Sequence, residues 1–318
     1  MTLAEQIEIA CLMEATARKP GNVHPAAAFS DLTYNDFVQA AKAVAAPLAA
    51  LAPSSAGGTD IGPGRNLRTS SPGPPRLGAA IFNAVRATRD ATGTNVNLGI
   101  ILLLAPLVAV PHNVPLEEGI GAVLDNTTTG DAGEVYAAIR LALPGGMGEA
   151  SSQDIREQPT VTLREAMQLA VDRDRIAEQY CTNYRLVFAA RRKLADLFLT
   201  TTDWEQAVVL LHVWMMAEWP DTLIARKCGW DIARESATRA AAVLTTAVGS
   251  ALPDRSRLAE LDCWLRSDGH RRNPGTTADL VAAALFAALR DGLIPSPTRS
   301  AITDRANLIL TATAETTI

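Results

Sequence analysis

The stretch TLAEQIEIACLMEATARKPGNVHP, residues 2–25, contains the pattern that determines the fold class. Its apolar side chains recur at helical spacing, at Leu3, Ile7 and Cys11. Thr2 and Glu5 have the spacing of a capping box at the start of a helix. Pro20 and Gly21 stop the pattern, because proline cannot extend a helix and glycine favours the turn after one. The sequence therefore predicts an amphipathic helix from about Thr2 to Arg18.

Helical periodicity continues through most of the chain. Candidate start signals recur before later apolar segments, at Thr33 with Asp36, at Thr162 with Glu165, and at Asp203. Each cap is worth only about 1 kcal/mol, but together they mark the starts of helices. Runs of β-branched residues bounded by turns, the usual sign of strands, are nearly absent. We therefore predict an all-α fold, a single multi-helix domain of roughly ten to twelve helices over residues 1–318.

Composition and charge narrow the class of protein. The 318 residues are 48% hydrophobic, which fits either a large core or a buried homo-oligomer interface. The net charge of −5 gives no overall positive field, so we expect neither nucleic acid nor a membrane as a partner. The longest apolar run, residues 98–110, is too short to cross a bilayer. Because the N-terminus also lacks a signal-peptide pattern, we predict a cytoplasmic protein.

Familiar catalytic signatures are absent from the sequence. It contains no Walker A sequence, GxGxxG, GxSxG or HExxH. The four cysteines are scattered without a CxxC pair, which predicts reduced thiols and no zinc or iron–sulfur site. His212 lies in an apolar run and is interpreted as a core histidine. The candidate chemistry therefore lies at polar helix ends.

One segment, residues 53–76, is rich in proline, glycine and serine and is predicted to be a flexible loop. It carries Arg65, Arg68 and Arg76 against Asp60 alone. Two interpretations stay open. The segment is either a lid over an anionic ligand or a solvated surface loop.

The turn after the first helix gives the first candidate site. Helix termination explains Lys19 and Gly21, because a cation suits the negative end of the helix dipole and glycine suits the turn. Termination does not require Asn22 or His24, which makes these two residues candidates for ligand contact or acid–base chemistry. Glu14, one helical turn before the end of this helix, adds a carboxylate.

A second candidate lies before the most apolar helix of the chain. Asn95 and Asn97 precede it, and either residue is explained as a cap. The alternative is that the two amides and the free N–H groups at the helix start bind an anionic ligand. Gly99 would allow a ligand or a neighbouring helix to approach closely.

Acidic residues gather at the start of a third helix. Asp125, Asp131 and Glu134 lie there among threonines. Carboxylates at a helix N-terminus are favourable without any function. Closely spaced carboxylates and hydroxyls are also what a hydrated Mg²⁺ needs, so a magnesium site is the alternative interpretation.

Two later helix ends complete the set of candidates. Asp221 is expected to cap a short helix whose last turn carries Arg226 and Lys227. This pair of cations could also clamp phosphates. Thr276 or Thr277 opens a later helix, and Asp279 in its first turn would repel an anion unless a metal or a ligand hydroxyl intervened.

Five segments in this order resemble the triphosphoribosyl-dephospho-CoA synthase family. They are EATARKPGNVHP, GTNVNLGIILLLAPL, DNTTTGDAGEVYAAIRLALPGGMG, PDTLIARKCG and NPGTTADLVAAALF. The resemblance spans most of the chain and implies an all-α enzyme. Such an enzyme transfers the triphosphoribosyl part of ATP to the ribose 2′-hydroxyl of 3′-dephospho-CoA and releases adenine. The implied partners are therefore ATP, with Mg²⁺, and dephospho-CoA or a related acceptor.

For that reaction, the polar residues are assigned by chemical type. Asp279, Glu14 and His24 are the acid–base candidates. The substrate-binding candidates are Lys19, Gly21, Asn22, Asn95, Asn97, Arg226, Lys227 and Thr277. Asp125 and Asp131 are the Mg²⁺ candidates, with Asp279 as a further one.

Two motifs depart from the family members associated with citrate lyase, which read Lys-Pro-Gly-Leu-Val-Asp and Asn-Thr-His-Lys-Gly. Here His24 stands where a carboxylate would be, and Leu98 stands where a cation would be. The chain resembles more closely the archaeal branch linked to tetrahydromethanopterin, so a step in one-carbon cofactor synthesis is one alternative function. An N-glycosidic hydrolase and a non-catalytic nucleotide-binding protein are the others.

Overall fold

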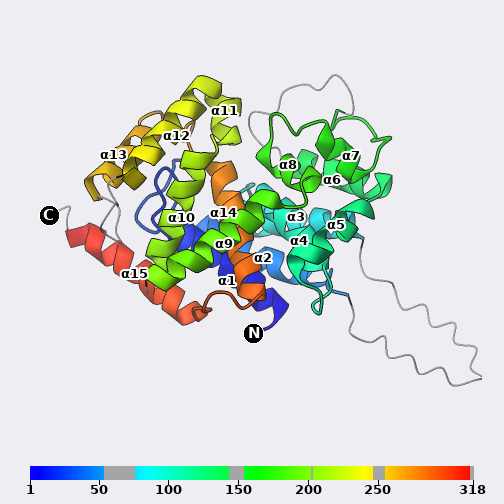
Figure 1. Cartoon of the computed structure of the whole chain (residues 1–318), viewed down its shortest axis with the longest axis horizontal. Helices are drawn as coiled ribbons and strands as arrows, with labels where there is room; N and C mark the ends of the chain where they lie inside the picture. The colour runs from blue at the N-terminus through cyan, green and yellow to red at the C-terminus, as the bar shows by residue number, and fades with distance from the viewer. Residues whose placement is uncertain (54–75, 143–153, 202, 246–254, 316–318) are drawn as a thin grey trace, which may run out of the picture.

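The computed structural model describes residues 1–53, 76–142, 154–201, 203–245 and 255–315, and these residues form fifteen α-helices (Figure 1). The first seven are α1 (Leu3–Thr16), α2 (Tyr34–Ala49), α3 (Leu77–Thr92), α4 (Leu98–Ala109), α5 (Leu116–Asp125), α6 (Thr129–Ala142) and α7 (Leu163–Gln168). The next four are α8 (Arg175–Cys181), α9 (Arg185–Thr200), α10 (Trp204–Glu218) and α11 (Thr222–Cys228). The last four are α12 (Trp230–Thr245), α13 (Arg255–Arg266), α14 (Gly275–Arg290) and α15 (Arg299–Glu315).

The predicted all-α class is confirmed, but the predicted number of ten to twelve helices is wrong. Short helices account for part of the difference, because α7, α8 and α11 have only six or seven residues each. The sequence from α7 to α8 reads as one continuous helical pattern. In the structure, Asp174 starts a new helix there, since its side chain accepts a hydrogen bond from the N–H of Ile176 at 2.8 Å.

Most helix starts predicted from the sequence are confirmed. Thr2 and Glu5 form a capping box on α1, and Thr33 with Asp36 does the same on α2. The Thr162 box opens α7, and Asp203 caps α10. These signals are local to one turn of chain, so they are readable without knowledge of the tertiary structure.

Helix α14 is the centre of the core. Every residue from Thr276 to Arg290 is buried except Asp279. Its many alanines allow α1, α4, α9 and α10 to pack closely around it. In Figure 1, α14 lies near the middle of the molecule, with α11 to α13 towards one end and α5 to α8 towards the other. Asp279 is therefore a carboxylate carried into the interior by the most buried helix of the protein.

Most of the predicted loop at 53–76 lies outside the described residues, because the structure does not describe residues 54–75. Its last arginine, Arg76, precedes α3 and donates a hydrogen bond to Thr128 at 2.7 Å. Within the described residues, no single helix is long and apolar enough to cross a membrane, although α10 and α11 together pass that test across a bend of 57°.

Candidate functional site

A cavity of about 560 Å³ opens between α4, α6, α7, α8, α11 and α14. This volume lies within the range of small-molecule sites in proteins. Six of the residues assigned to acid–base, substrate-binding or metal-binding roles from the sequence line it: Glu14, Asn22, Asn95, Arg226, Lys227 and Asp279. The cavity therefore gathers helix ends that lie far apart in the sequence.

The N-termini of two long helices open onto this cavity. Leu98 and Gly99 at the start of α4 line it, as do Gly275 and Thr276 at the start of α14. Free N–H groups and the positive end of the helix dipole favour an anionic group at such positions. The wall formed by α6 and α7 is mostly apolar. The cavity thus suits a ligand with both a charged and an apolar part.

Asp279 faces the cavity from the first turns of α14. It lies directly against Gly99, because a Cβ atom at that glycine would be 2.1 Å from Asp279 Oδ2. The expected close approach at Gly99 is therefore made by α14. Burial raises the pKa of Asp279 well above its usual range, and the nearby carboxylates of Glu14, Asp221 and Asp174 raise it further. These effects favour a protonated Asp279 in the ligand-free protein.

Glu14 and Lys19 form a buried ion pair beside the cavity. Lys19 Nζ lies 2.9 Å from Glu14 Oε1, and the side chain of Lys19 is fully buried. The same ammonium also contacts the main-chain oxygens of Glu14 and Ala17. Its three N–H donors are therefore committed within the protein, and Glu14 is the member of the pair that reaches the cavity. This geometry makes Lys19 the counter-charge of Glu14 and does not favour direct phosphate contact.

The turn at Gly21 packs tightly between two other elements. Its N–H donates to Asp262 Oδ1 at 2.7 Å. Its φ of +76° is in the left-handed region, which glycine adopts readily. A Cβ atom here would lie 2.8 Å from Leu265 Cδ1 and 2.9 Å from Pro274 Cδ. Gly21 therefore lets this wall of the site approach α13 and the start of α14, and it does not line the cavity itself.

We expect Gly21→Ala to lower the free energy of unfolding more than Gly93→Ala does. Both glycines have left-handed φ angles, so each substitution costs about 1–2 kcal/mol of backbone strain. Only the Gly21 variant adds an overpacking cost of about 1–3 kcal/mol, because nothing lies within 4 Å of a Cβ at Gly93. Urea unfolding of the two variants measures the difference. Equal losses would show that the close packing at Gly21 is not present.

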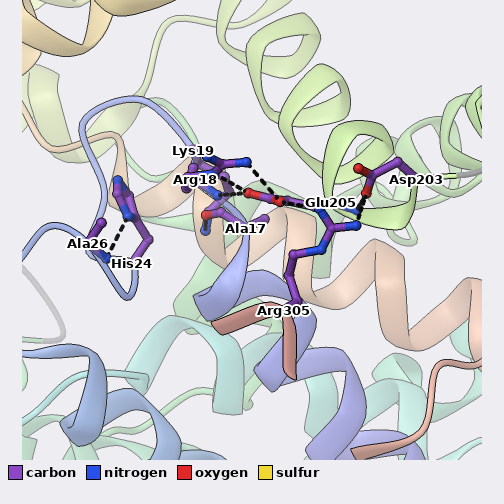
Figure 2. A network of polar contacts seen from close by, with 8 residues as sticks. All are labelled: Ala17, Arg18, Lys19, His24, Ala26, Asp203, Glu205 and Arg305. Atoms are coloured by element: carbon purple, nitrogen blue, oxygen red, sulfur yellow. Dashed lines mark hydrogen bonds and ion pairs between the residues drawn. The ribbon is translucent and has the colours of Figure 1, made fainter. Parts of the chain in front are cut away.

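Asn22 and His24, the two residues that helix termination does not explain, have different environments. Asn22 is buried, lines the cavity, and its Nδ2 lies 3.2 Å from Nε2 of His212. His212 is fully buried, as predicted for a core histidine. His24 does not line the cavity. Its Nδ1 accepts a hydrogen bond from the N–H of Ala26 at 3.3 Å (Figure 2).

His24 should stay neutral across the physiological range. Burial, followed by the charges of Arg266, Lys19 and Arg18, lowers its pKa to about 3. In the unfolded chain the pKa is about 6.5, so only the unfolded state takes up this proton as the pH falls between these values. The contribution to stability is therefore complete above about pH 6.5 and is lost towards about pH 3.

We expect the unfolding free energy of His24→Gln to fall less than that of the wild type between about pH 7 and about pH 4.5, as measured by urea titration. Equal slopes would contradict the lowered pKa.

The two asparagines before α4 have different environments in the structure. Asn95 lines the cavity and accepts a hydrogen bond from the N–H of Leu98 at 3.3 Å. Asn97 occupies the N-cap position but makes no cap with its side chain. Its Oδ1 instead accepts from Thr88 Oγ1 at 3.1 Å, on the side of a smaller cavity of about 220 Å³. Asn95 is therefore both a cap and a residue of the site.

Arg226 and Lys227 at the end of α11 bring positive charge to the cavity. Arg226 Nη1 lies 2.9 Å from Asp174 Oδ2. Lys227 Nζ makes no ion pair or hydrogen bond within the described residues. Burial, with the neighbouring charge of Arg226, lowers the pKa of Lys227. An anionic ligand would relieve both effects, so these cations suit phosphate.

Asp221 and Thr277 hold the ends of two helices together. Asp221 caps α11, as predicted, through the N–H groups of Leu223 and Ile224. Its second oxygen accepts from both the N–H and the hydroxyl of Thr277, at 2.7 and 2.8 Å. Thr277 was predicted to contact substrate. In the structure its hydroxyl is used to fix α14 relative to α11.

The two residues predicted to bind Mg²⁺ lie outside the cavity. Asp125 forms an ion pair with Arg164 at the surface. Asp131 is buried, and its oxygens accept hydrogen bonds from Gly78 N–H and from the N–H and hydroxyl of Thr128. Both carboxylates are therefore committed to structural contacts. Among the described residues, no group of three or more His, Cys, Asp or Glu side chains is arranged to hold a metal.

The structure adds polar residues that the sequence analysis did not select. Asp174, Arg173 and Asn273 line the cavity. Asn273 Oδ1 is buried without a hydrogen-bond partner in the described part of the chain. Asp174 lies inside a continuous helical pattern in the sequence, and its contact with Arg226, 52 residues away, depends on two helices meeting in space. No local signal marks such a contact.

The fold and the cavity define an all-α protein with a mixed-charge cavity suited to a small anionic molecule. The family model described as ATP:dephospho-CoA triphosphoribosyl transferase matches residues 1–297, and the chain belongs to this family. The predicted resemblance is therefore confirmed.

A solved structure gives the same indication. The chain is similar to a crystal structure from Archaeoglobus fulgidus of a protein provisionally named triphosphoribosyl-dephospho-CoA synthase. The sequences are 25% identical, the TM-score is 0.55, and the match covers 68% of this chain and 90% of the other. A comparison with curated proteins gives no match.

Proposed function

We propose that the protein transfers the triphosphoribosyl part of ATP to 3′-dephospho-CoA and releases adenine. Membership of the transferase family supports the reaction class. The observation that carries the assignment to this cavity is the placement of two carboxylates, Glu14 and Asp279, in one cavity with the cations Arg226 and Lys227. The carboxylates without the cations, or the cations without the carboxylates, would not serve the reaction.

The chemistry explains why both kinds of charge are needed. The bond between C1′ of the ribose and N9 of adenine breaks, and a bond forms between C1′ and the acceptor hydroxyl oxygen. The departing adenine takes up a proton, and the acceptor hydroxyl loses one. Positive charge develops at C1′ during the exchange, while the triphosphate remains strongly negative throughout. Carboxylates near C1′ therefore lower the barrier, whereas cations along the triphosphate bind and orient the donor.

The two carboxylates suit different steps. Asp279, whose raised pKa favours the protonated form, would donate a proton to adenine and then receive one from the acceptor hydroxyl. Glu14, paired with the Lys19 ammonium, supplies negative charge towards C1′. Separation of two carboxyl groups by their environments is how one site provides both an acid and an anion.

The triphosphate is assigned to the cations Arg226 and Lys227 and to the helix N-termini. Lys227, whose Nζ has no partner among the described residues, is available to phosphate without breaking a contact. Arg226 would have to share its guanidinium between Asp174 and the ligand. At the helix starts, the N–H groups of Leu98 and Thr277 are already bonded to Asn95 and Asp221, so the donors left for phosphate are those of the neighbouring residues Gly99 and Thr276.

Mg²⁺ is part of the proposal only as the ion that arrives with ATP. The described residues offer no preformed metal cage, and Asp125 and Asp131 are engaged elsewhere. Mg²⁺ commonly keeps several waters and binds through substrate phosphates with few protein ligands. No residue of this chain is therefore assigned to it.

The two sequence departures bear on the acceptor. Leu98, which precedes the glycine that Asp279 contacts, lines the cavity, whereas His24 lies outside it. An apolar side chain at that point favours an uncharged part of a ligand. This supports an acceptor related to dephospho-CoA but held differently, and it keeps the one-carbon cofactor alternative within the proposal.

The experiment combines the purified protein with ATP, Mg²⁺ and dephospho-CoA, and measures adenine and the mass of the product. We expect equal amounts of adenine and of a product enlarged by the triphosphoribosyl group. Absence of adenine, beside an active enzyme of the family, would overturn the proposal. Adenine released in equal amount without dephospho-CoA would identify an N-glycosidic hydrolase instead.

A further inference from the structure

The C-terminal helix α15 lies beyond residue 297, where the match to the family ends, yet it contacts the elements that carry the site. It packs against α1 and buries Ile302, Ala306 and Ile309. From the same helix Arg305 reaches the start of α10 (Figure 2). The helix is therefore joined to the protein by polar contacts as well as by an apolar face.

Glu205 is the buried carboxylate at which these contacts meet. Its side chain is only 4% exposed. Arg305 Nη1 lies 3.2 Å from Glu205 Oε2, and the other end of the same guanidinium lies 3.0 Å from Asp203, the cap of α10. Glu205 also accepts three hydrogen bonds from Arg18: Oε1 accepts from the side-chain Nε at 2.6 Å and from the main-chain N–H at 3.3 Å, and Oε2 accepts from Nη2 at 3.2 Å. A buried carboxylate held by two guanidinium groups and a main-chain N–H has one orientation available.

Arg18 links this network to the wall of the cavity. The main-chain contact fixes the peptide immediately before Lys19, the partner of Glu14. The chain then turns sharply through Gly21 to Asn22, which lines the cavity. A shift of the Arg18 peptide would therefore be passed directly to Lys19 and Asn22. Because Asn22 is a substrate-binding candidate that lines the cavity, such a shift would weaken ligand binding there.

We propose that Arg305 is a positioning residue: by orienting Glu205 it fixes the main chain at Arg18 and so holds residues 18–24 in place at the cavity. The expected change in the KM for ATP rests on the proposed function, whereas the expected change in hydrogen exchange at the Arg18 amide does not. The C-terminal helix thus contributes to the site without touching it.

The test compares two arginines of the same helix. Arg305→Ala removes the contact with Glu205, and Arg299→Ala removes the ion pair of α15 with Glu8 on α1, which leaves Glu205 untouched. We expect Arg305→Ala to raise the hydrogen-exchange rate of the Arg18 amide by about tenfold, because local opening becomes easier. In adenine release, we expect the KM for ATP to rise by about tenfold with kcat changed by less than about threefold. Arg299→Ala should change neither quantity.

Two further variants make the inference sharper. Arg305→Lys keeps a positive charge beside Glu205, so it should recover part of the loss; it also carries the measurement if Arg305→Ala does not fold. The double variant Glu205→Gln with Arg305→Ala should have the same KM as Glu205→Gln alone, since the arginine acts through that carboxylate. If the two substitutions raised the KM by independent factors that multiply, Arg305 would not act through Glu205.

The outcomes separate this inference from the proposed function. If the wild type releases no adenine, the function is wrong, and hydrogen exchange at Arg18 still decides the role of Arg305. Unchanged exchange in Arg305→Ala overturns the inference. So does an equal rise in Arg299→Ala, because α15 would then act only through general stability.

Discussion

Asp279→Asn is expected to reduce adenine release by about 10²–10⁴-fold, the usual contribution of a positioned acid or base. The carboxyl lies in the cavity against Gly99, and among the described residues it receives no hydrogen bond that would give it a structural task. An amide of the same shape cannot carry the proton. The loss should appear in kcat, with little change in the KM for ATP, because the group acts at the reacting atoms.

Stability distinguishes this role from a structural one. The raised pKa of Asp279 means that its contribution to stability is present below its unfolded value and is lost as the pH rises through the folded value. Asp279→Asn should therefore be at least as stable as the wild type above neutral pH. Asp221→Asn provides the contrast, because that carboxylate accepts four hydrogen bonds and its loss should lower the unfolding midpoint in urea. An Asp279→Asn variant that loses stability and activity together would contradict the proposed role.

The fold class was predictable because its signals are local. Capping boxes and helical periodicity involve residues three or four apart, and most predicted starts are confirmed. The number of helices was not, since breaks such as the one at Asp174 depend on how neighbouring helices meet. The order of five motifs indicated the family correctly, although no single motif would have done so.

The site was predictable in part, and the errors have a common cause. The sequence placed Glu14 one turn before Arg18 on a continuing helix. The helix ends at Thr16, so Arg18 turns to Glu205, 187 residues away, and Lys19 folds back onto Glu14. The chemical types at the site were therefore recognised, while the partner of each charge was set by tertiary contacts. Contacts between residues far apart in the chain leave no repeating pattern in the sequence from which they could be predicted.

The Glu14–Lys19 pair gives the second large expected effect: Lys19→Met should lower the free energy of unfolding by about 3–5 kcal/mol. Both side chains are buried, and Lys19 Nζ is the cation within 2.9 Å of the Glu14 carboxylate. Removal of the ammonium leaves a charge inside the protein without its counter-ion, which costs far more than the pair itself contributes. Urea unfolding measures the loss. Lys42→Met, at an exposed lysine of α2, is the matched control and should change stability by less than about 0.5 kcal/mol.

The double variant decides what Lys19 does. Glu14→Gln with Lys19→Met removes both charges, so most of the lost stability should return. Activity should not return with it, because Glu14 is the carboxylate that the pair presents to the cavity. If Lys19 bound phosphate directly, Lys19→Met would raise the KM for ATP without a large loss of stability. A stable Lys19→Met protein with weakened ATP binding would therefore overturn the counter-charge role and restore the phosphate contact predicted from the sequence.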